Sequence, residues 1–476
     1  MNMTSGNKST EIRLYNTLTR DLQDLYFCED KIRIYLCGVT VYDESHIGHA
    51  RTIIVFDVLR RYLSSKGYST NFVQNFTDVD DKIINRARFE GTEAGEISSR
   101  YICRYFRDFH SLNVLDADHY PLATRHISEI VELIKALILK GFAYITLKGV
   151  YFRVKRFPGY GKLSKKSIKE LELGARVQID SSKEDALDFA LWKFSSDRPF
   201  FESPWGKGRP GWHIECSAMA LKYLGNTFEI HGGGNDLIFP HHENEIAQSE
   251  SSLGSEFAKI WIHVGMVTVN SEKMSKSLGN IISIEHALKD WGMNTLRLYC
   301  ISVQYSKPLD YTPRLLQEAM QKWRQIETCG SELIFAEGKG GDITAMDRLC
   351  YDSKVEFESA MNNDINTPLA LTAFMKFVNK INQYAANDIL TRDTSMVALR
   401  LYNHFMDTFG LKLVPVPEHE RKDIERLVNL RSNMRRDGRF EDSDIIRKEL
   451  AEKYSVEIMD HKDRTIWKRV ENKYIN

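Results

Sequence analysis

Hydrophobic positions in the first two thirds of the chain follow two different periods, one typical of strands and one typical of helices. Apolar side chains at every second position predict a strand over residues 32–37, and helical spacing predicts a helix over residues 47–66 that ends at Gly67. A second strand is predicted over residues 68–76. A strand, a loop, a helix and another strand form a βαβ unit, so this pattern predicts a parallel sheet.

The alternation is interrupted near the middle of the chain. An amphipathic helix is predicted over residues 124–140, followed by a hairpin over residues 142–154 that turns at Lys148-Gly149. This pattern predicts a subdomain inserted into the sheet domain at about residues 120–205. Helices and strands then alternate again, at residues 213–224 (helix), 226–230 (strand), about 241 onward (helix) and 259–264 (strand).

Beyond residue 310 the strand patterns fade and helical periodicity remains. The helices, which predict a bundle, are expected over residues 312–335, 346–360, 366–385 and 395–409, before a linker at 413–417. The predicted fold class is α/β, with a Rossmann-like parallel-sheet domain, an inserted subdomain, a helical bundle and a small C-terminal mixed domain. The predicted boundaries are 1–119 and 206–265 for the two halves of the sheet domain, then 120–205, 266–311, 312–412 and 413–476.

Composition narrows the class of protein. A length of 476 residues implies roughly two to four domains, and 42% hydrophobic with 27% charged residues is typical of a globular chain. We expect no membrane span, because no apolar run reaches the roughly 18 residues required, and no secretory signal, because residues 1–10 are polar. Seven cysteines without a Cys-x-x-Cys pair fit reduced thiols in a cytoplasmic protein.

The charge balance bears on nucleic-acid binding. A net charge of zero argues against a protein that coats nucleic acid non-specifically, but it leaves room for a local basic face. Residues 421–440 carry seven Lys or Arg against three Asp or Glu. Within this stretch Arg431, Arg435, Arg436 and Arg439 lie on or next to one predicted helix, and Trp467 follows nearby. Basic side chains and an aromatic ring suit RNA binding, but a solvated helix face and a packed tryptophan are the commoner explanation for any one of these residues.

Two short motifs carry candidate nucleotide chemistry. The histidine motif, His46-Ile47-Gly48-His49, lies where a loop enters a helix, and a helix N-terminus suits an anion. The lysine motif, Lys273-Met274-Ser275-Lys276-Ser277, lies between a predicted hairpin and a helix beginning near Ser283. Ammonium groups on such a loop can close over phosphates. Alone, each motif also fits an ordinary polar loop, but together they favour a nucleoside triphosphate site.

A candidate metal site and a second ligand loop follow the later strands. His241 and Glu245 are spaced i, i+4, so they share one helix face and can bind one metal. Cys37 ends the first strand and Cys216 lies in a later helix, and each also fits a small buried core residue. His242 and Glu243 are the alternative ligands. The run from His231 to Asp236 is rich in glycine, which permits close approach of a ligand to the backbone.

The two motifs resemble the signatures of the class I aminoacyl-tRNA synthetases. Four further segments are similar to cysteinyl-tRNA synthetases: Leu36–Asp43, Phe76–Lys82, Gly211–Met219 and His231–Glu245. The resemblance is strongest over about residues 11–310 and weaker in the helical remainder. It implies an enzyme that activates L-cysteine with ATP to cysteinyl-adenylate and transfers it to the 3′ end of tRNA-Cys, without an editing domain.

The resemblance also implies roles for particular residues. Zinc, one per subunit, is expected on Cys37, Cys216, His241 and Glu245, where it selects the cysteine thiolate. ATP with Mg²⁺ is expected at His46, Gly48, His49, Gly234, Asp236, Lys273 and Lys276, of which the two histidines and two lysines are catalytic. Cysteine is expected at Gly38, Thr77, Trp212 and His231, although core packing is the commoner role for such a tryptophan.

Residues 266–311 are then expected to contact the tRNA stem and residues 413–476 the anticodon, with the four arginines and Trp467 as candidate contacts, in a monomer. The family carries a glycine in the turn before this tryptophan, and Asp460–Trp467 has none. Two other functions fit the same residues. One is a ligase that moves activated cysteine onto a small-molecule amine, which would not need the C-terminal domains. The other is a catalytically silent tRNA-binding protein, which would not need the intact motifs.

Overall fold

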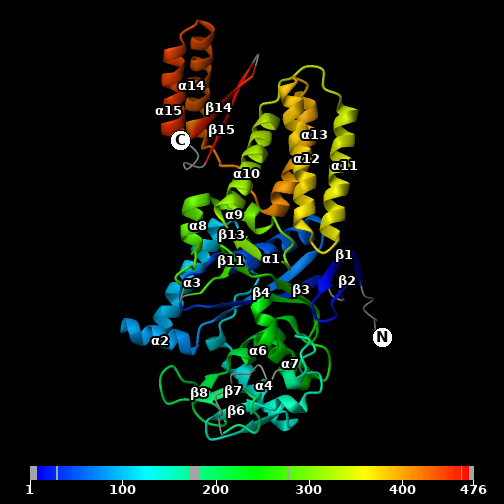
Figure 1. Ribbon diagram of the computed structural model, residues 1–476, viewed down its shortest axis with the longest axis vertical. Coiled ribbons are helices and arrows are strands. Elements are labelled where there is room, and N and C mark those ends of the chain that lie inside the picture. Colours follow the sequence, from blue (N-terminus) through cyan, green and yellow to red (C-terminus); the bar gives the residue numbers. More distant parts are fainter. Residues whose placement is uncertain (1–7, 28–29, 171–181, 276–277, 462–463, 471–476) are drawn as a thin grey trace.

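A four-stranded parallel sheet lies at the centre of the molecule, with strand order β10-β9-β3-β4 (Figure 1). The computed structural model describes residues 8–27, 30–170, 182–275, 278–461 and 464–470. The strands are β3 (Lys31–Thr40), β4 (Ser69–Thr77), β9 (Phe228–Gly234) and β10 (Ala258–Val264). The predicted α/β fold class is therefore confirmed, and each predicted strand of this sheet is present.

Helices cover both faces of the sheet. Ile34 and Leu36 of β3 belong to the hydrophobic cluster that includes α1 (Ile47–Ser65). Tyr35 and Cys37, which point to the other face, pack in the cluster of α6 (Trp212–Leu224) and α7 (Glu243–Leu253). Burial on both faces is typical of parallel sheets, and the predicted helices at these positions are confirmed.

The N-terminal segment forms a hairpin that the sequence analysis did not predict. Strands β1 (Lys8–Asn16) and β2 (Asp21–Phe27) pair with each other and lie beside β10. Asn16 connects this hairpin to β10, since its Nδ2 donates to Lys259 O at 2.8 Å and its Oδ1 accepts from Trp261 N at 3.0 Å. Helices α2 (Asp81–Glu90) and α3 (Ala94–Ser111), which follow β4, were also not predicted.

The segment between the two halves of the sheet forms a second, antiparallel sheet. The predicted helix is α4 (Ile127–Leu139), and the predicted hairpin consists of β5 (Ala143–Ile145) and β6 (Gly149–Phe152). Two strands that were not predicted, β7 (Phe189–Phe194) and β8 (Gly208–Pro210), complete the order β5-β6-β7-β8. This sheet is tied to α2 because Asp81 pairs with Lys193 at 3.0 Å and Arg209 at 3.1 Å.

The last third of the chain is mainly helical and lies at one end of the molecule (Figure 1). A small sheet with strands β11 (Val267–Val269), β12 (Glu272–Lys273) and β13 (Leu309–Tyr311) leads into it, together with α8 (Ile284–Trp291) and α9 (Met293–Cys300). The predicted bundle consists of α10 (Pro313–Ile334), α11 (Ile343–Asn362), α12 (Thr367–Ala386) and α13 (Arg392–Phe409). The predicted mixed C-terminal unit consists of α14 (Glu418–Arg436), α15 (Phe440–Tyr454), β14 (Val456–Asp460) and β15 (Thr465–Arg469). None of the described helices is long and apolar enough to cross a membrane.

A buried ion pair joins the sheet domain to the bundle. Arg297 of α9 is fully buried and donates to Asp57 of α1, to Leu112 O at 2.9 Å and to Phe409 O, at the end of α13, at 2.7 Å. Burial alone would raise the pKa of Asp57, but Arg297 and Arg61 together hold it below its ordinary value. Four segments distant in sequence therefore meet at one charged contact.

We expect Asp57→Asn to lower the free energy of unfolding by about 3–5 kcal/mol, because it leaves the buried Arg297 guanidinium without its counter-charge. Chemical denaturation followed by circular dichroism measures the change. The matched control is Glu318→Gln, which breaks an exposed pair with Arg314 and should cost less than about 1 kcal/mol. Equal effects of the two substitutions would contradict this assignment.

Candidate functional site

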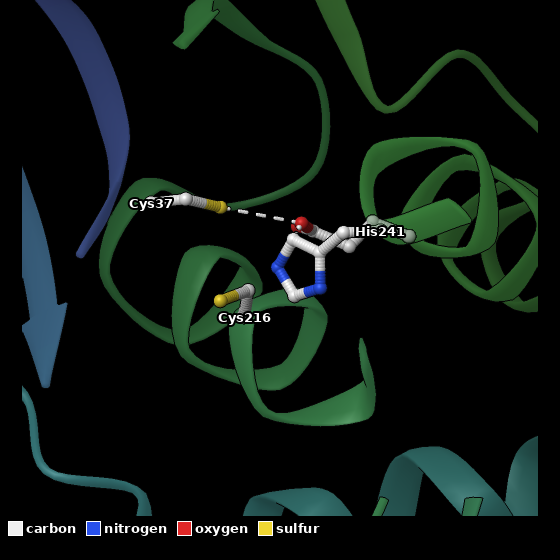
Figure 2. Close-up of side chains that lie close together, drawn as sticks. Cys37, Cys216 and His241 are labelled. Atoms are coloured by element: carbon white, nitrogen blue, oxygen red, sulfur yellow. Dashed lines mark hydrogen bonds and ion pairs between the residues drawn. The ribbon is translucent and has the colours of Figure 1, made fainter. Parts of the chain in front are cut away.

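A cluster of side chains of metal-ligand type lies at the carboxyl end of β3. Figure 2 shows Cys37, Cys216 and His241 gathered around one point, and Glu245 joins them from the first turn of α7. All four side chains are buried, and one donor atom from each lies within 4.8 Å of the others. The structure therefore brings together the four residues that were expected to hold zinc.

Local geometry explains how Cys37 reaches this position. The pairing of β3 with β4 shifts register between Leu36 and Val39, so the strand bulges where Cys37 and Gly38 lie. Gly38 N donates to Asn75 Oδ1 at 2.9 Å. A side-chain carbon at Gly38 would lie only 1.6 Å from Asn75 O, so the bulge requires glycine. Asn75 was not singled out from the sequence.

The polar groups of the cluster are short of partners in the protein itself. Glu245 Oε1 accepts from Cys37 Sγ at 3.3 Å and lies 3.0 Å from His241 Nε2, whereas the buried Oε2 has no hydrogen-bond partner among the described residues. Burial raises the pKa of Glu245 and of Cys37, while hydrogen bonding with Cys37 lowers the pKa of Cys216 to about 7. A buried carboxylate oxygen without a hydrogen-bond partner, such as Glu245 Oε2, is stabilised by a cation. Thiolate, imidazole and carboxylate donors suit zinc.

A second donor set overlaps the first. Cys37, His231, His242 and Glu245 also offer atoms within 4.8 Å of one another. His231 Nε2 lies 3.5 Å from Cys37 Sγ and 3.4 Å from Glu245 Oε2. Both sets contain Cys37 and Glu245. Cys216 and His241 complete the first set, and His231 and His242 complete the second.

Side chains behind the cluster orient its histidines. His213 Nδ1 lies 2.9 Å from His241 Nδ1, which leaves Nε2 of His241 facing Glu245. His242 Nδ1 bonds His263 Nε2 at 2.8 Å. Glu243, the other alternative ligand, instead accepts from the backbone of Leu163 and Ser164. His213 and His263 were not identified from the sequence, because no spacing rule links them to the cluster.

The histidine motif forms the first turn of α1. His46 is the N-cap, and its Nδ1 accepts from Gly48 N at 3.2 Å and His49 N at 3.4 Å. His49 Nδ1 accepts from His46 N at 3.3 Å, which completes a reciprocal capping box. A backbone N–H can only donate, so both Nδ1 atoms are unprotonated and both protons lie on Nε2. Burial, and then His46, lower the pKa of His49, which keeps this ring neutral.

The lysine motif lies against the histidine motif. Lys273 is exposed at the end of β12, whereas Lys276 lies outside the described residues. A side-chain carbon at Gly48 would lie 3.2 Å from Met274 Cε, so the two motifs are in contact. Beyond the motif, Ile47 N donates to Ile282 O and Ile284 N to Ser45 O, both at 3.0 Å.

The glycine run continues β9 toward α1. A side-chain carbon at Gly232 would lie 2.0 Å from Phe56 Cζ, so this glycine allows the sheet to pack against α1. At Gly234 the same atom would lie 2.5 Å from Asp236 Oδ1 and 4.0 Å from Thr52 Oγ1. Gly234 and Asp236 therefore lie near the helix that begins with the histidine motif.

Of the expected amino-acid contacts, Gly38 and His231 adjoin Cys37, whereas Thr77 and Trp212 lie on β4 and α6. Thr77 ends β4 and its hydroxyl donates to Glu215 Oε2 at 3.0 Å, where burial raises the pKa of Glu215. Trp212 is 38% exposed and stacks on His241 with ring centroids 4.2 Å apart, so it does not pack in the core. A small polar pocket next to Trp212 is lined by Glu215, Asp80 and Asp81. Glu215 was not singled out from the sequence.

Two of the expected tRNA contacts have packing roles instead. Arg431 is fully buried and forms a bidentate pair with Asp460 at 2.7 and 2.8 Å. Trp467 is 5% exposed and packs against Phe335. Neither side chain presents a surface to RNA. Helical spacing did not distinguish Arg431 from the exposed Arg435, Arg436 and Arg439, and Trp467 lies on β15. Residues 462–463 of the turn without glycine lie outside the described residues.

Comparison with known proteins supports one class. Residues 25–321 match the family model described as tRNA synthetases class I (C) catalytic domain, and residues 356–413 match the DALR domain. A solved structure of Mycobacterium tuberculosis methionyl-tRNA synthetase with methionyl-adenylate has a TM-score of 0.63 at 15% identity, covering 84% of this chain and 94% of that chain. That likeness shows the fold. Fold and site together define a class I aminoacyl-tRNA synthetase.

Full-length relatives define the family. A protein of Thermodesulfovibrio yellowstonii named cysteine–tRNA ligase is 45% identical, covering 96% of this chain and 99% of the relative. Proteins of the same name from Pyrococcus abyssi and Geobacillus thermodenitrificans are each 43% identical, covering 96% and 97% of this chain and 99% of each relative. The chain belongs to the cysteine–tRNA ligase family.

Substitutions outside the shared pair distinguish the two donor sets. Loss of a side chain that only supports a ligand costs about 10–100-fold in metal affinity. If the metal uses Cys216 and His241, we therefore expect His241→Asn to weaken zinc binding by more than about 100-fold. His242→Asn, the matched control one residue away, should then cost about 100-fold or less. Competition with a chromophoric chelator measures both affinities. The reverse order would assign the metal to His231 and His242.

Proposed function

We propose that the chain is a cysteine–tRNA ligase that activates L-cysteine with ATP and transfers it to the 3′ end of tRNA-Cys. The observation that carries this proposal is the meeting of two kinds of chemistry at one sheet edge. The thiol, imidazole and carboxylate cluster lies at the carboxyl end of β3, and the contacting histidine and lysine motifs lie at the start of α1, which follows β3. Ligands bind at such edges in parallel sheets.

In the first step a cysteine carboxylate oxygen attacks the α-phosphorus of ATP, and the bond to pyrophosphate breaks. The Nε2–H groups of His46 and His49 donate to the phosphate oxygens, where negative charge grows in the transition state. Because both rings are neutral donors, they act by electrostatic stabilisation and not by proton transfer. Lys273 and Lys276 offset the charge of the leaving pyrophosphate, and Mg²⁺ bound with ATP would supply further positive charge there. The backbone of Gly48 contacts ATP, and Gly234 and Asp236 bind ATP near its ribose.

Cys37, Cys216, His241 and Glu245 hold zinc in this proposal. A bound zinc ion lowers the pKa of a thiol and prefers sulfur to the hydroxyl of serine. Thr77 and Gly38 bind the amino-acid backbone, and Trp212 covers the pocket. His231, which contacts Cys37 and Glu245, is the fourth amino-acid contact. Glu215 accepts a hydrogen bond from the Thr77 hydroxyl, so the lone pairs of Thr77 Oγ1 remain available to a substrate ammonium.

In the second step the 2′-hydroxyl of the terminal ribose attacks the adenylate carbonyl, and AMP leaves. Residues 266–311 contact the tRNA stem and residues 413–476 the anticodon, with Arg435, Arg436 and Arg439 as the exposed cations of that unit. In this proposal the synthetase acts as a monomer. The six described cysteines form no disulfide with one another, which supports a reducing, cytoplasmic compartment.

The proposed activity predicts which amino acid is attached. With ATP, Mg²⁺ and a tRNA-Cys transcript, we expect charging with radiolabelled cysteine and rejection of serine by at least about 10⁴-fold in kcat/KM. Cysteine-dependent pyrophosphate exchange without charging would indicate a small-molecule ligase. The absence of both reactions would favour a silent tRNA-binding protein.

Because His46 both caps α1 and donates to phosphate in this proposal, different substitutions should affect stability and activity separately. His46→Asn keeps a side chain that can cap α1 but removes the Nε2–H, so the rate of adenylate formation should fall about 10²–10³-fold with little change in stability. His46→Ala should lose the same activity and a further ~1 kcal/mol of stability. Single-turnover kinetics and chemical denaturation give the two readings. A fully active Asn variant would exclude the electrostatic role.

A further inference from the structure

Arg51 occupies an unusual position next to the histidine motif. It lies on α1 two residues after His49, and its side chain is fully buried. Its guanidinium donates to Gly265 O at 2.9 Å and to Met266 O and Gln304 O, both at 3.3 Å. No carboxylate of the described residues pairs with it, and its Nε has no hydrogen-bond partner there.

The three carbonyls belong to the segments that support the lysine motif. Gly265 and Met266 connect β10 to β11, and β11 pairs with β12, which contains Lys273. Gln304 lies in the loop before β13, which pairs with the other edge of β11. A side-chain carbon at Gly265 would lie 2.2 Å from Lys307 O, so the two segments are in direct contact. Arg51 therefore binds both the segment that enters β11 and the loop before β13, its neighbouring strand.

The far end of the lysine motif is also attached to α1. The backbone bonds of Ser45 and Ile47 with Ile284 and Ile282 hold the segment after the motif, and Met274 rests on Gly48. The hairpin is thus anchored on both sides to the first turns of one helix. Arg51 supplies a side-chain anchor on the side where the chain enters the motif.

Stability alone does not explain a buried guanidinium at this place. Removing a charge from water is expensive, and neutral carbonyls compensate less than a carboxylate does. An apolar residue of similar volume often replaces such a group without loss of stability. What an apolar residue cannot do is join three carbonyls from two loops to one helix.

We propose that Arg51 is a positioning residue for ATP activation, which sets the separation between the lysine motif and the histidine motif. It touches neither ATP nor cysteine. It holds β11 at a fixed distance from the first turn of α1, so that Lys273 and the two imidazoles meet the same triphosphate. This inference rests on the proposed function, because the substrate of both motifs is ATP.

The test compares Arg51→Met with Arg60→Met, a matched variant on the same helix. Arg60 is also buried and donates to the carbonyls of Leu115 and Asp116, away from both motifs. Arg51→Met should lower kcat for cysteine-dependent pyrophosphate exchange about 10–100-fold, since a displacement near 1 Å costs about 10²-fold, with KM for cysteine and zinc content unchanged. Arg51→Lys should recover part of the rate. Arg60→Met should retain wild-type kcat.

A double variant separates positioning from a general defect. If Arg51 acts through Lys273, the effect of Arg51→Met in a Lys273→Ala background should shrink to less than about 3-fold. Effects that multiply independently, or wild-type kcat in Arg51→Met, would overturn the proposal. So would equal loss of kcat in the Arg51 and Arg60 variants.

Hydrogen exchange gives a reading that does not require activity. Amides of residues 265–273 should exchange faster in Arg51→Met than in the wild type, and at the wild-type rate in Arg60→Met. Unchanged exchange in Arg51→Met would overturn the inference whatever the enzyme does. If instead the wild type shows no cysteine-dependent exchange of pyrophosphate, the proposed function fails, while the amide measurement still decides the role of Arg51.

Discussion

The buried contact between Asp57 and Arg297 is the constraint on which the rest of the structure depends, because it fixes the position of α1. That helix is rigid, so fixing its middle also fixes the groups on its first turns. His46 and His49 begin the helix, and Arg51 follows within the next turn. A single charged contact with the bundle therefore determines where the nucleotide chemistry lies relative to the sheet.

The central sheet separates two kinds of chemistry and joins them at its edge. Cys37 faces α6 and α7, where the other candidate metal ligands lie, whereas the histidine motif begins the helix on the opposite face. The loop between Cys37 and His46 carries the chain from one face to the other around the carboxyl end of β3. In the proposed reaction, cysteine would lie at the cluster on one side of this loop and ATP at the histidine motif on the other.

Sequence reasoning was most successful where one local rule determined the structure. The strands and helix of the first βαβ unit followed from periodicity, and the i, i+4 spacing placed His241 and Glu245 on one face. Cys37 and Cys216 joined them only through the family resemblance. The second donor set, the His213 and Asn75 contacts, and the burial of Arg431 and Trp467 depend on segments far apart in the chain. No pattern within a single helix or strand carries that information.

The capping histidines of α1 also limit how this chain can vary. Serine, threonine, aspartate or asparagine at position 46 would still cap the helix, and lysine or arginine would still offer a donor to an anion. Asparagine also has an acceptor and a donor, but both lie on one short amide group, whereas the imidazole ring carries its acceptor Nδ1 and its donor Nε2–H on opposite sides. Replacing His46 therefore removes the cap, worth about 1 kcal/mol, or the donor proposed for the phosphate, while histidine supplies both with one side chain.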